Sequence, residues 1–381
     1  MVIFLSKLKI FRMEEQVFDP KLADTNQSDI VCKNCAAKLV FEPGTTSLAC
    51  PYCGTVNEIE IREESIDELD FDQYLKDAEK GNDIQEVSTI ACEACGAVTS
   101  LDPNVVSSEC PFCGNKLIVK NESTSKLIKP KSLLPFKISS KEALESFKKW
   151  LKKLWFAPPG LKKYASQAEK VAGMYLPYWT YDSDTFTNYR GQRGDDYTTT
   201  ESYTDGSGKS QTRTVTKTRW TNVSGSVRLF FDDVLVIASK SLPQKKTDKL
   251  EPWDLENLVP FDEKFLSGFR SESYGLGLKE GFDVAKLKMD PKIRQAINRQ
   301  IGGDHQRITW MQTTFSNITF KHVLLPIWIS AYRFKNKVYR FIVNGRTGKV
   351  QGERPWCWWK IALLVLVIAG AIAALVYFGG E

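Results

Sequence analysis

Cysteine spacing is the feature of this 381-residue chain that most restricts its fold. Eight of the nine cysteines form four C-x2-C pairs, and these pairs make two units with the same spacing, C-x2-C-x14-C-x2-C. Each cysteine of the second unit follows its counterpart by 60 residues, and the eight are Cys32, Cys35, Cys50, Cys53, Cys92, Cys95, Cys110 and Cys113. Paired spacing of this kind in a long chain indicates two metal sites and not a disulfide framework.

The ligand set of each unit favours zinc. Four thiolates suit tetrahedral zinc, and two C-x2-C turns on facing hairpins supply that geometry. Gly54 and Gly114 follow the last cysteine of each unit, where the backbone turns tightly. The pattern offers no histidine, aspartate or open position for chemistry, so we expect two structural zinc ions. Sulfur-only ligands also suit rubredoxin-like iron, which stays open as an alternative.

Charge is divided unevenly along the chain. Residues 1–120 contain 11 Lys and Arg against 21 Asp and Glu, whereas the remainder contains 41 against 25. A surface that binds duplex DNA needs clustered Lys and Arg to neutralise phosphates. Both cysteine units and the segment between them are acidic, so the sequence argues against nucleic-acid binding by the cysteine units.

The end of the sequence predicts a membrane anchor. Residues 361–378 carry no charge and would span about 27 Å as a helix, enough for a thin hydrocarbon core. Tryptophans and Lys360 precede this run, as at a membrane interface. Within residues 335–360 seven basic residues precede the run, and none follows it: Lys335, Lys337, Arg340, Arg346, Lys349, Arg354 and Lys360. We therefore expect a single-pass tail anchor in the cytoplasmic membrane, with the bulk of the chain in the cytoplasm and the C-terminus outside.

A second, fainter repeat lies in the middle of the chain. The stretch "LLPF" at 133–136 recurs as "LVPF" at 258–261, and "YLPYW" at 175–179 recurs as "LLPIW" at 324–328. Two short motifs in the same order favour a duplicated mixed α/β-sheet region. Each copy is expected to contain one helix, starting at Ser139 or Ser140 in the first and at Asp290-Pro291 in the second.

These features predict a multidomain α+β chain. The expected parts are an N-terminal tail at 1–28, zinc ribbon 1 at 29–61, an acidic and partly helical linker at 62–86, zinc ribbon 2 at 87–120, repeat 1 at 121–248 with a polar β-hairpin insert at 195–221, repeat 2 at 249–355, and the transmembrane tail anchor at 356–381. Ser65 is the candidate cap of the linker helix.

Catalytic patterns are absent from the sequence. The stretch "GSGKS" at 206–210 lacks the first glycine of a phosphate loop, and "GLGLKEG" from Gly275 misses the dinucleotide pattern by one residue. His305 and His322 stand outside any HExxH motif, and no nucleophile elbow occurs. The acidic pairs Asp182/Asp184 and Asp232/Asp233 are typical of turns and caps. We expect no enzyme and no nucleotide site.

The combination of "CPYCG" at 50–54, "CPFCG" at 110–114, repeated L-P-x-W strands and one C-terminal helix resembles a bacterial family. Its members are double zinc-ribbon membrane proteins encoded beside SPFH-domain and PspA-type envelope-stress proteins. They are often labelled primosomal protein N′ (replication factor Y), superfamily II helicase, although no helicase loop occurs here. The resemblance implies a cytoplasm-facing membrane scaffold that recruits partner proteins.

Three hypotheses for the function follow. The leading one is a tail-anchored zinc-ribbon adaptor that brings protein partners, including SPFH- or PspA-type proteins, to the membrane. The second is a nucleic-acid-binding accessory protein of replication or transcription, for which salt-dependent DNA binding by residues 29–120 is the expected sign. The third is a rubredoxin-like redox protein, which would contain iron.

Overall fold

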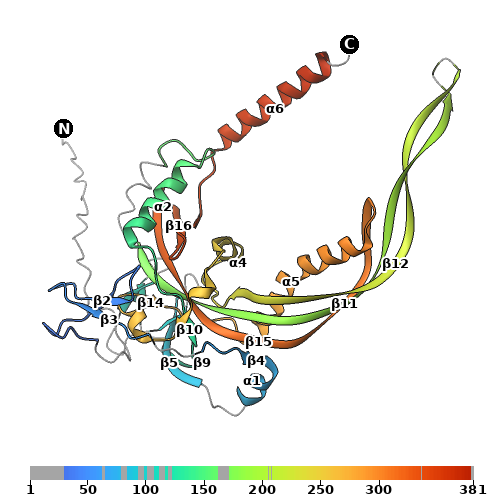
Figure 1. The fold of residues 1–381 in the computed structure, drawn as a ribbon. Coiled ribbons are helices and arrows are strands. Elements are labelled where there is room, and N and C mark those ends of the chain that lie inside the picture. The colour runs from blue at the N-terminus through green and yellow to red at the C-terminus, as the bar shows by residue number, and fades with distance from the viewer. Residues whose placement is uncertain are drawn as a thin grey trace, which may run out of the picture.

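Figure 1 shows the fold in a computed structural model, in which a long curved antiparallel sheet carries much of the chain. The curved arm consists of β11 (Ala172–Thr204), β12 (Ser210–Ile237) and β15 (His305–Phe334). Helix α6 (Trp358–Phe378) projects away from the sheet. The architecture is α+β, as predicted. The structure describes residues 30–61, 65–78, 84–92, 98–100, 107–110, 116–118, 122–161, 171–204, 206, 208–335 and 337–378.

The large sheet has nine strands, and its main path runs β12-β11-β15-β10-β13. Strand β11 pairs antiparallel with both β12 and β15. Two short strands join the long ones in parallel: β10 (Ser132–Leu133) pairs with β15, and β14 (Arg270–Ser271) pairs with β11. The remaining members are β4 (Leu69–Asp70), β13 (Val259–Pro260), β16 (Lys337–Asn344) and β17 (Val350–Gly352).

The two L-P-x-W motifs lie opposite each other on β11 and β15. Leu176 pairs with Leu325, so the second residue of one motif faces the second residue of the other. The tryptophans make matching hydrogen bonds: Trp179 Nε1 donates to the Leu276 carbonyl at 2.9 Å, and Trp328 Nε1 donates to the Ile138 carbonyl at 3.1 Å. An antiparallel pair centred on equivalent residues relates the two halves by a local twofold arrangement.

Backbone hydrogen bonds extend the correspondence between the two halves, but they assign a different segment as the counterpart of the "LLPF" motif. The Leu134 N–H donates to the Leu324 carbonyl, and the Glu272 N–H donates to the Tyr175 carbonyl. Each of these donors lies five residues before a helix N-cap, Ser139 or Gly277. The structural counterpart of "LLPF" at 133–136 is therefore the segment 271–274. The "LVPF" segment at 258–261 instead contributes β13, which pairs antiparallel with β10.

Helix α2 (Ser140–Lys152) forms as predicted. Ser139 caps it through a capping box with Glu142, in which the Glu142 N–H donates to the Ser139 Oγ at 3.3 Å. Its buried face consists of Ala143, Phe147 and Leu151. The helix ends at Lys152, before Pro158 and Pro159.

The predicted start of the second helix was wrong. Helix α5 spans Leu278–Ile301, and Pro291 lies inside it instead of beginning it. A stripe of buried residues continues past the proline at helical spacing: Leu278, Phe282, Ala285, Met289, Ile293, Ile297 and Ile301. Pro291 is on the exposed side. Packing of this stripe on the sheet outweighs the local cost of an interior proline.

The structure contains the predicted polar hairpin, but the hairpin is much longer than the predicted insert at 195–221. Strands β11 and β12 pair continuously from Tyr178↔Ile237 to Thr204↔Ser210, with one register shift near Tyr181. The inner half carries buried residues such as Trp179 and Val236, whereas the outer half is mostly exposed. The sequence pattern therefore revealed only the solvent-facing end of strands that begin in the core.

The acidic linker contributes to the large sheet. Strand β4 pairs with β15 through Leu69↔Phe320, and helix α1 (Phe71–Ala78) follows it. Asp70, not Ser65, accepts a hydrogen bond from the first turn, from the Gln73 N–H at 2.7 Å. Phe71 is buried against Tyr181, Phe282 and Phe320. The segment is thus attached to the sheet and α5.

The cysteine-rich parts form small antiparallel sheets. The first cysteine unit, residues 30–61, contains β1 (Val40–Phe41), β2 (Ser47–Ala49) and β3 (Val56–Glu58) in one three-stranded sheet. In the second region, a three-stranded sheet and a two-stranded sheet are built from β5 (Ile84–Ala91), β6 (Val98–Ser100), β9 (Glu122–Ile128), β7 (Ser107–Glu109) and β8 (Lys116–Ile118).

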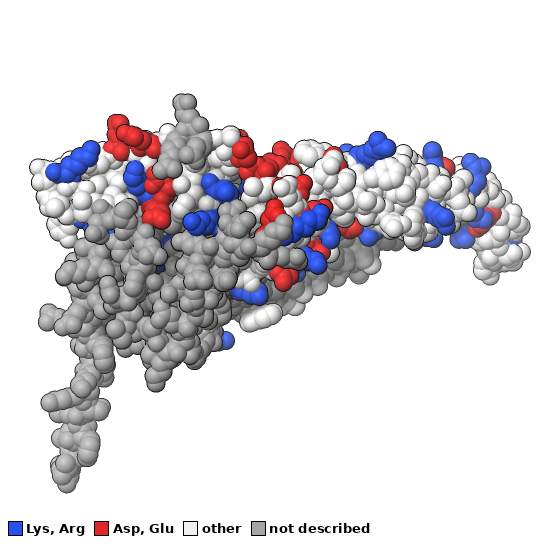
Figure 2. Space-filling model, turned by 90° about the horizontal axis from the view of Figure 1, so that it is seen from below, with Lys and Arg blue, Asp and Glu red and all other residues white. Residues whose placement is uncertain are grey.

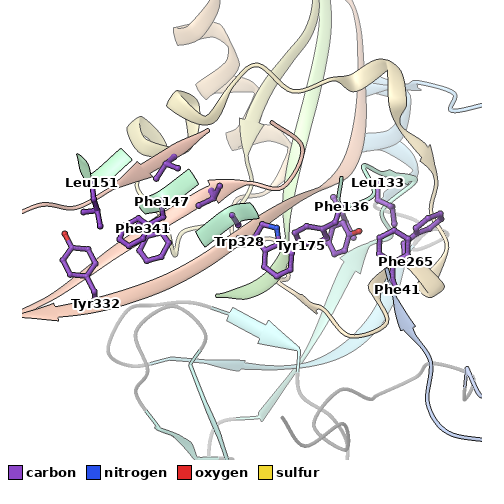
Figure 3. Packing of buried hydrophobic residues seen from close by; sticks show 14 of the residues in the cluster. Phe41, Leu133, Phe136, Phe147, Leu151, Tyr175, Phe265, Trp328, Tyr332 and Phe341 are labelled. Atoms are coloured by element: carbon purple, nitrogen blue, oxygen red, sulfur yellow. The ribbon is translucent and has the colours of Figure 1, made fainter. Parts of the chain in front are cut away.

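The first cysteine unit shares a hydrophobic core with the large sheet. Phe41 packs edge-on against Phe265 at 5.2 Å between ring centroids, in the cluster that also holds Leu133 and Phe136 (Figure 3). The Phe41 N–H donates to the Ser267 carbonyl at 3.0 Å, and the Ser267 Oγ donates to the Leu39 carbonyl at 2.6 Å. The unit is therefore held by apolar burial and by hydrogen bonds from both backbone and side chain.

Candidate metal centre

The four cysteines of the first unit converge on one point. The Sγ atoms of Cys32 and Cys53 are 3.6 Å apart, and those of Cys35 and Cys50 are 3.4 Å apart. All four ligand atoms lie within 4.8 Å of one another. Sulfurs at about 2.3 Å from a tetrahedral zinc would be about 3.8 Å apart. The group can therefore hold a metal ion after only a small adjustment of the sulfur positions.

Two backbone turns of the same form present the cysteines. The Cys32 carbonyl accepts from the Ala36 N–H at 2.9 Å, and the Cys50 carbonyl accepts from the Gly54 N–H at 3.0 Å. Gly54 has φ +70°, as its place after the last cysteine suggested, and Ala36 has φ +57° in the matching position. A left-handed alanine costs free energy that the rest of the turn must offset. No sequence signal marks Ala36 as left-handed.

Hydrogen bonds make the pKa values of Cys32, Cys35 and Cys53 unequal. Backbone N–H groups of Cys35 and Asn34 lower the pKa of Cys32, and the hydroxyl and N–H of Thr55 lower the pKa of Cys53 to about 6. The Ala37 N–H acts to lower the pKa of Cys35, but the neighbouring sulfurs of Cys50 and Cys53 raise it to about 12. Thiolates are the metal-binding form, so binding displaces the remaining protons.

The chemistry available to such a centre is structural. Cys32 and Cys50 are buried, whereas Cys35 and Cys53 are exposed at the rim. Four sulfurs close a tetrahedron and leave no position for a substrate. The ligand set is consistent with zinc and does not by itself distinguish zinc from iron.

The second unit is only partly within the described residues. Cys92 and Cys110 are buried, and both belong to the hydrophobic cluster that contains Leu176, Tyr178 and Trp253 of the large sheet and its loops. Cys95 and Cys113, the other two predicted ligands, lie outside the described residues. The second metal site therefore stays a prediction.

The remaining sequence-selected residues do not assemble around a metal within the described ranges. His305 pairs with Asp196 at 3.1 Å on the exposed arm. His322 is buried, its Nδ1 lies 2.9 Å from the Ile128 carbonyl, and burial lowers its pKa to about 4, so it stays neutral. Asp184 accepts a hydrogen bond from Asn317 Nδ2 at 2.9 Å. The acidic pairs Asp182/Asp184 and Asp232/Asp233 lie within β11 and β12, beside the register shift near Tyr181, and not in turns or caps as the sequence suggested.

A carboxyl pair between the buried Asp182 and the more exposed Glu68 escaped the sequence reasoning. Lys321 Nζ lies 3.0 Å from both Glu68 and Asp233, and the Asp233 N–H donates to Asp182 Oδ1 at 2.7 Å. Burial, then the hydrogen bond with Glu68, raises the pKa of Asp182 to about 7. Burial opposes ionisation of Glu68, but hydrogen bonds with Asp182, Thr319 and Lys321 lower its pKa to about 2. The proton shared by the two carboxyl groups therefore resides on Asp182.

This pair predicts a pH-dependent stability. The folded pKa of Asp182 exceeds its value of about 3.9 in an unfolded chain, so its stabilisation is complete below pH ~4 and is lost as pH rises through about 7. Glu68 contributes in the opposite sense, and only at lower pH. We expect the unfolding temperature of the detergent-solubilised protein to fall by a few degrees between pH 5 and pH 8, measured by tryptophan fluorescence.

The variant Asp182→Asn should weaken this trend, because an amide can donate permanently to Glu68 and still accept from the Asp233 N–H. Part of the trend should remain, because burial also raises the pKa of Glu272 to about 7. The exposed neighbour provides the matched control, since Asp184→Asn should keep the pH dependence of the unmodified protein. A slope in Asp182→Asn as steep as in the unmodified protein would show that other groups cause the pH dependence.

Helix α6 is the second feature with chemical consequences. Trp358–Tyr377 has mean hydropathy 2.5, and none of it is buried against the rest of the described chain. Its exposed apolar residues include Leu366, Leu375 and Val376. By length and composition, this helix can cross a membrane.

Comparisons with known proteins identify one similar protein, and they do not indicate an activity. The chain is similar to an uncharacterised protein, YdjG of Bacillus subtilis (strain 168), with 29% identity over 340 residues. The match covers 89% of this chain and 93% of that protein. No family model matches the chain, and no solved structure matches it. The similarity extends over nearly the full length of both proteins.

Proposed function

We propose that this protein is a membrane-anchored scaffold, in which α6 spans the cytoplasmic membrane and the cysteine units are zinc ribbons that bind partner proteins in the cytoplasm. The observation that carries this proposal is an apolar helix without buried residues on the same chain as a closed four-sulfur centre. The helix suits membrane anchoring, and the four-sulfur centre suits a structural metal site that stabilises a rigid binding module and has no catalytic role.

The docking surface would be the exposed face of the first ribbon. Three apolar side chains there are largely solvent-exposed: Val31 at 49%, Tyr52 at 68% and Val56 at 57%. Other side chains of this ribbon are buried, because Phe41 and Leu39 pack into the core shared with the large sheet. Exposed apolar residues gathered on one small module are typical of a protein-interaction site. Partners of the SPFH or PspA type are those that the family resemblance implies.

Crosslinking followed by pull-down from membranes tests this proposal. The full chain should capture a reproducible set of proteins, and Tyr52→Ala with Val56→Ser should lose them at least several-fold while keeping its metal. Tyr203→Ala, an exposed tyrosine on the arm, is the matched control and should capture the same set. Equal capture by the ribbon variant and the control would contradict docking through the first ribbon.

Nucleic-acid binding is a second candidate because of the arm. Arg guanidinium groups lie over exposed rings there: Arg307 over Trp220 at 4.6 Å, Arg190 over Trp310 at 5.6 Å, and Arg213 over Tyr203 at 5.6 Å. Such pairs can stack on single-stranded bases. On the face in Figure 2, however, the basic residues are scattered, with acidic residues among them, and form no continuous basic tract among the described residues. The expected sign of this function is salt-dependent oligonucleotide binding by the full chain.

A further inference from the structure

The turn that follows α2 is attached directly to the base of α6. The Cys357 N–H donates to the Phe156 carbonyl at 2.8 Å. Lys360 Nζ donates to the carbonyls of Trp155 and Ala157, at 3.2 and 2.9 Å. Two segments separated by about 200 positions thus meet where the apolar helix leaves the body (Figure 1). The C-terminal end of α2 therefore has a defined place beside the start of α6.

The side chains at this junction are the kinds that membrane interfaces favour. Trp155 is 81% exposed, although its neighbours Leu154 and Ala157 are buried and hold the turn in place. Trp358 and Trp359 are also exposed, at 77% and 59%. The last two turns of α2 and its C-cap add four exposed lysines: Lys148, Lys149, Lys152 and Lys153. We call Trp155 and these four lysines the basal patch.

Folding alone does not account for the basal patch. Cations in the last turn of a helix interact favourably with its dipole, which gives a reason for Lys149 and Lys152. The helix dipole gives no reason for the exposed indole of Trp155, which lies on a hydrogen-bonded turn beside an apolar helix. Tryptophan is enriched at the headgroup level of membranes, and neighbouring lysines are attracted to anionic lipid.

We propose that the basal patch binds the anionic lipid headgroups around α6, with Trp155 inserted at the interface and the four lysines over acidic lipid phosphates. The proposal rests on the proposed anchoring by α6. It adds a second attachment point, which fixes the orientation of the curved sheet relative to the membrane. One helix alone would leave the body free to rotate about the helix axis.

Photocrosslinking in vesicles tests the proposal on the full chain. Trp155→p-benzoylphenylalanine should crosslink to lipid in vesicles of phosphatidylcholine with phosphatidylglycerol, and several-fold less in phosphatidylcholine alone. The same substitution at Leu366 reports whether α6 is in the bilayer, and at Trp310 it reports background from the exposed arm.

Charge removal separates headgroup attraction from proximity. Lys→Gln at 148, 149, 152 and 153 should lower the crosslinking at position 155 several-fold in anionic vesicles. The matched control carries Lys→Gln at four exposed lysines elsewhere, at 245, 249, 279 and 292. This control should leave crosslinking at position 155 unchanged. Metal content and circular dichroism confirm that the variants are folded.

The possible outcomes separate the anchor from the basal patch. Crosslinking at 366 but only background crosslinking at 155 would overturn the basal patch and leave the anchor intact. Absence of lipid crosslinks at 366 would overturn the anchor and, with it, this inference. If crosslinking at 155 is equal in anionic and neutral vesicles and is unchanged by the four Lys→Gln substitutions, binding to anionic headgroups is overturned.

Discussion

Two arginines placed in the middle of α6, Leu366→Arg with Val367→Arg, are expected to transfer the protein from the membrane fraction to the soluble fraction. Each arginine at the centre of a membrane helix costs about 2.5–3.5 kcal/mol on the insertion scale, so the pair should lower insertion at least about a hundredfold. Both positions are exposed, at 69% and 61%, so the body of the protein should fold as before.

Carbonate extraction of membranes measures this effect, and the amount of protein in the washed pellet is the readout. Leu366→Ala with Val367→Ala is the matched control, because it shortens the same side chains without adding charge, and it should remain in the pellet. The soluble arginine variant should retain its metal content, since the four sulfurs belong to the first cysteine unit and α6 projects away from the sheet (Figure 1). An arginine variant that stays in the washed membrane would contradict anchoring by α6.

The substitution Cys50→Ser is expected to remove one metal ion per chain and to detach the first cysteine unit from the sheet. Serine oxygen is a poor substitute for a thiolate, and structural zinc supplies about 10–16 kcal/mol of apparent binding free energy in small zinc domains. Without that contribution, the three short strands of residues 40–58 are too small to keep their structure. Phe41 and Leu39 would then leave the shared core.

Elemental analysis of the purified protein measures the loss, and limited proteolysis within residues 30–61 reports the detachment. Cys357→Ser is the control, because Cys357 is a buried cysteine outside both units and should change neither result. Cys110→Ser should remove the second ion. Unchanged metal content in Cys50→Ser would refute the four-sulfur site, and iron in place of zinc would favour electron transfer.

Local patterns allowed part of this structure to be predicted. The cysteine spacing placed Cys32, Cys35, Cys50 and Cys53 in one cluster because two C-x2-C turns need few long-range contacts to meet. The cap at Ser139 and the apolar run of α6 were equally local signals. The repeated L-P-x-W motif correctly marked equivalent strand positions, which lie opposite each other on β11 and β15.

Long-range pairing accounts for the features that the sequence did not reveal. The start of α5 depends on a stripe that packs on the sheet, so Pro291 misled a prediction based on local signals. The carboxyl pair joins Glu68 to Asp182, residues from an apparent linker and from a core strand. The equivalence of 133–136 with 271–274 depends on backbone hydrogen bonds and leaves little trace in side-chain identity. Each of these features belongs to register and topology, which short motifs do not encode.

Thiol labelling of the full chain in sealed vesicles of known orientation, followed by peptide mass spectrometry, tests the metal-bound, cytoplasm-facing scaffold most directly. Cys35 and Cys53 are exposed, so only a bound metal and the membrane should protect them. We expect both to be labelled in inverted vesicles after a chelator is added, to be unlabelled before it, and to stay unlabelled in right-side-out vesicles. Labelling in intact right-side-out vesicles, or equal labelling with and without chelator, would contradict a metal-bound scaffold that faces the cytoplasm.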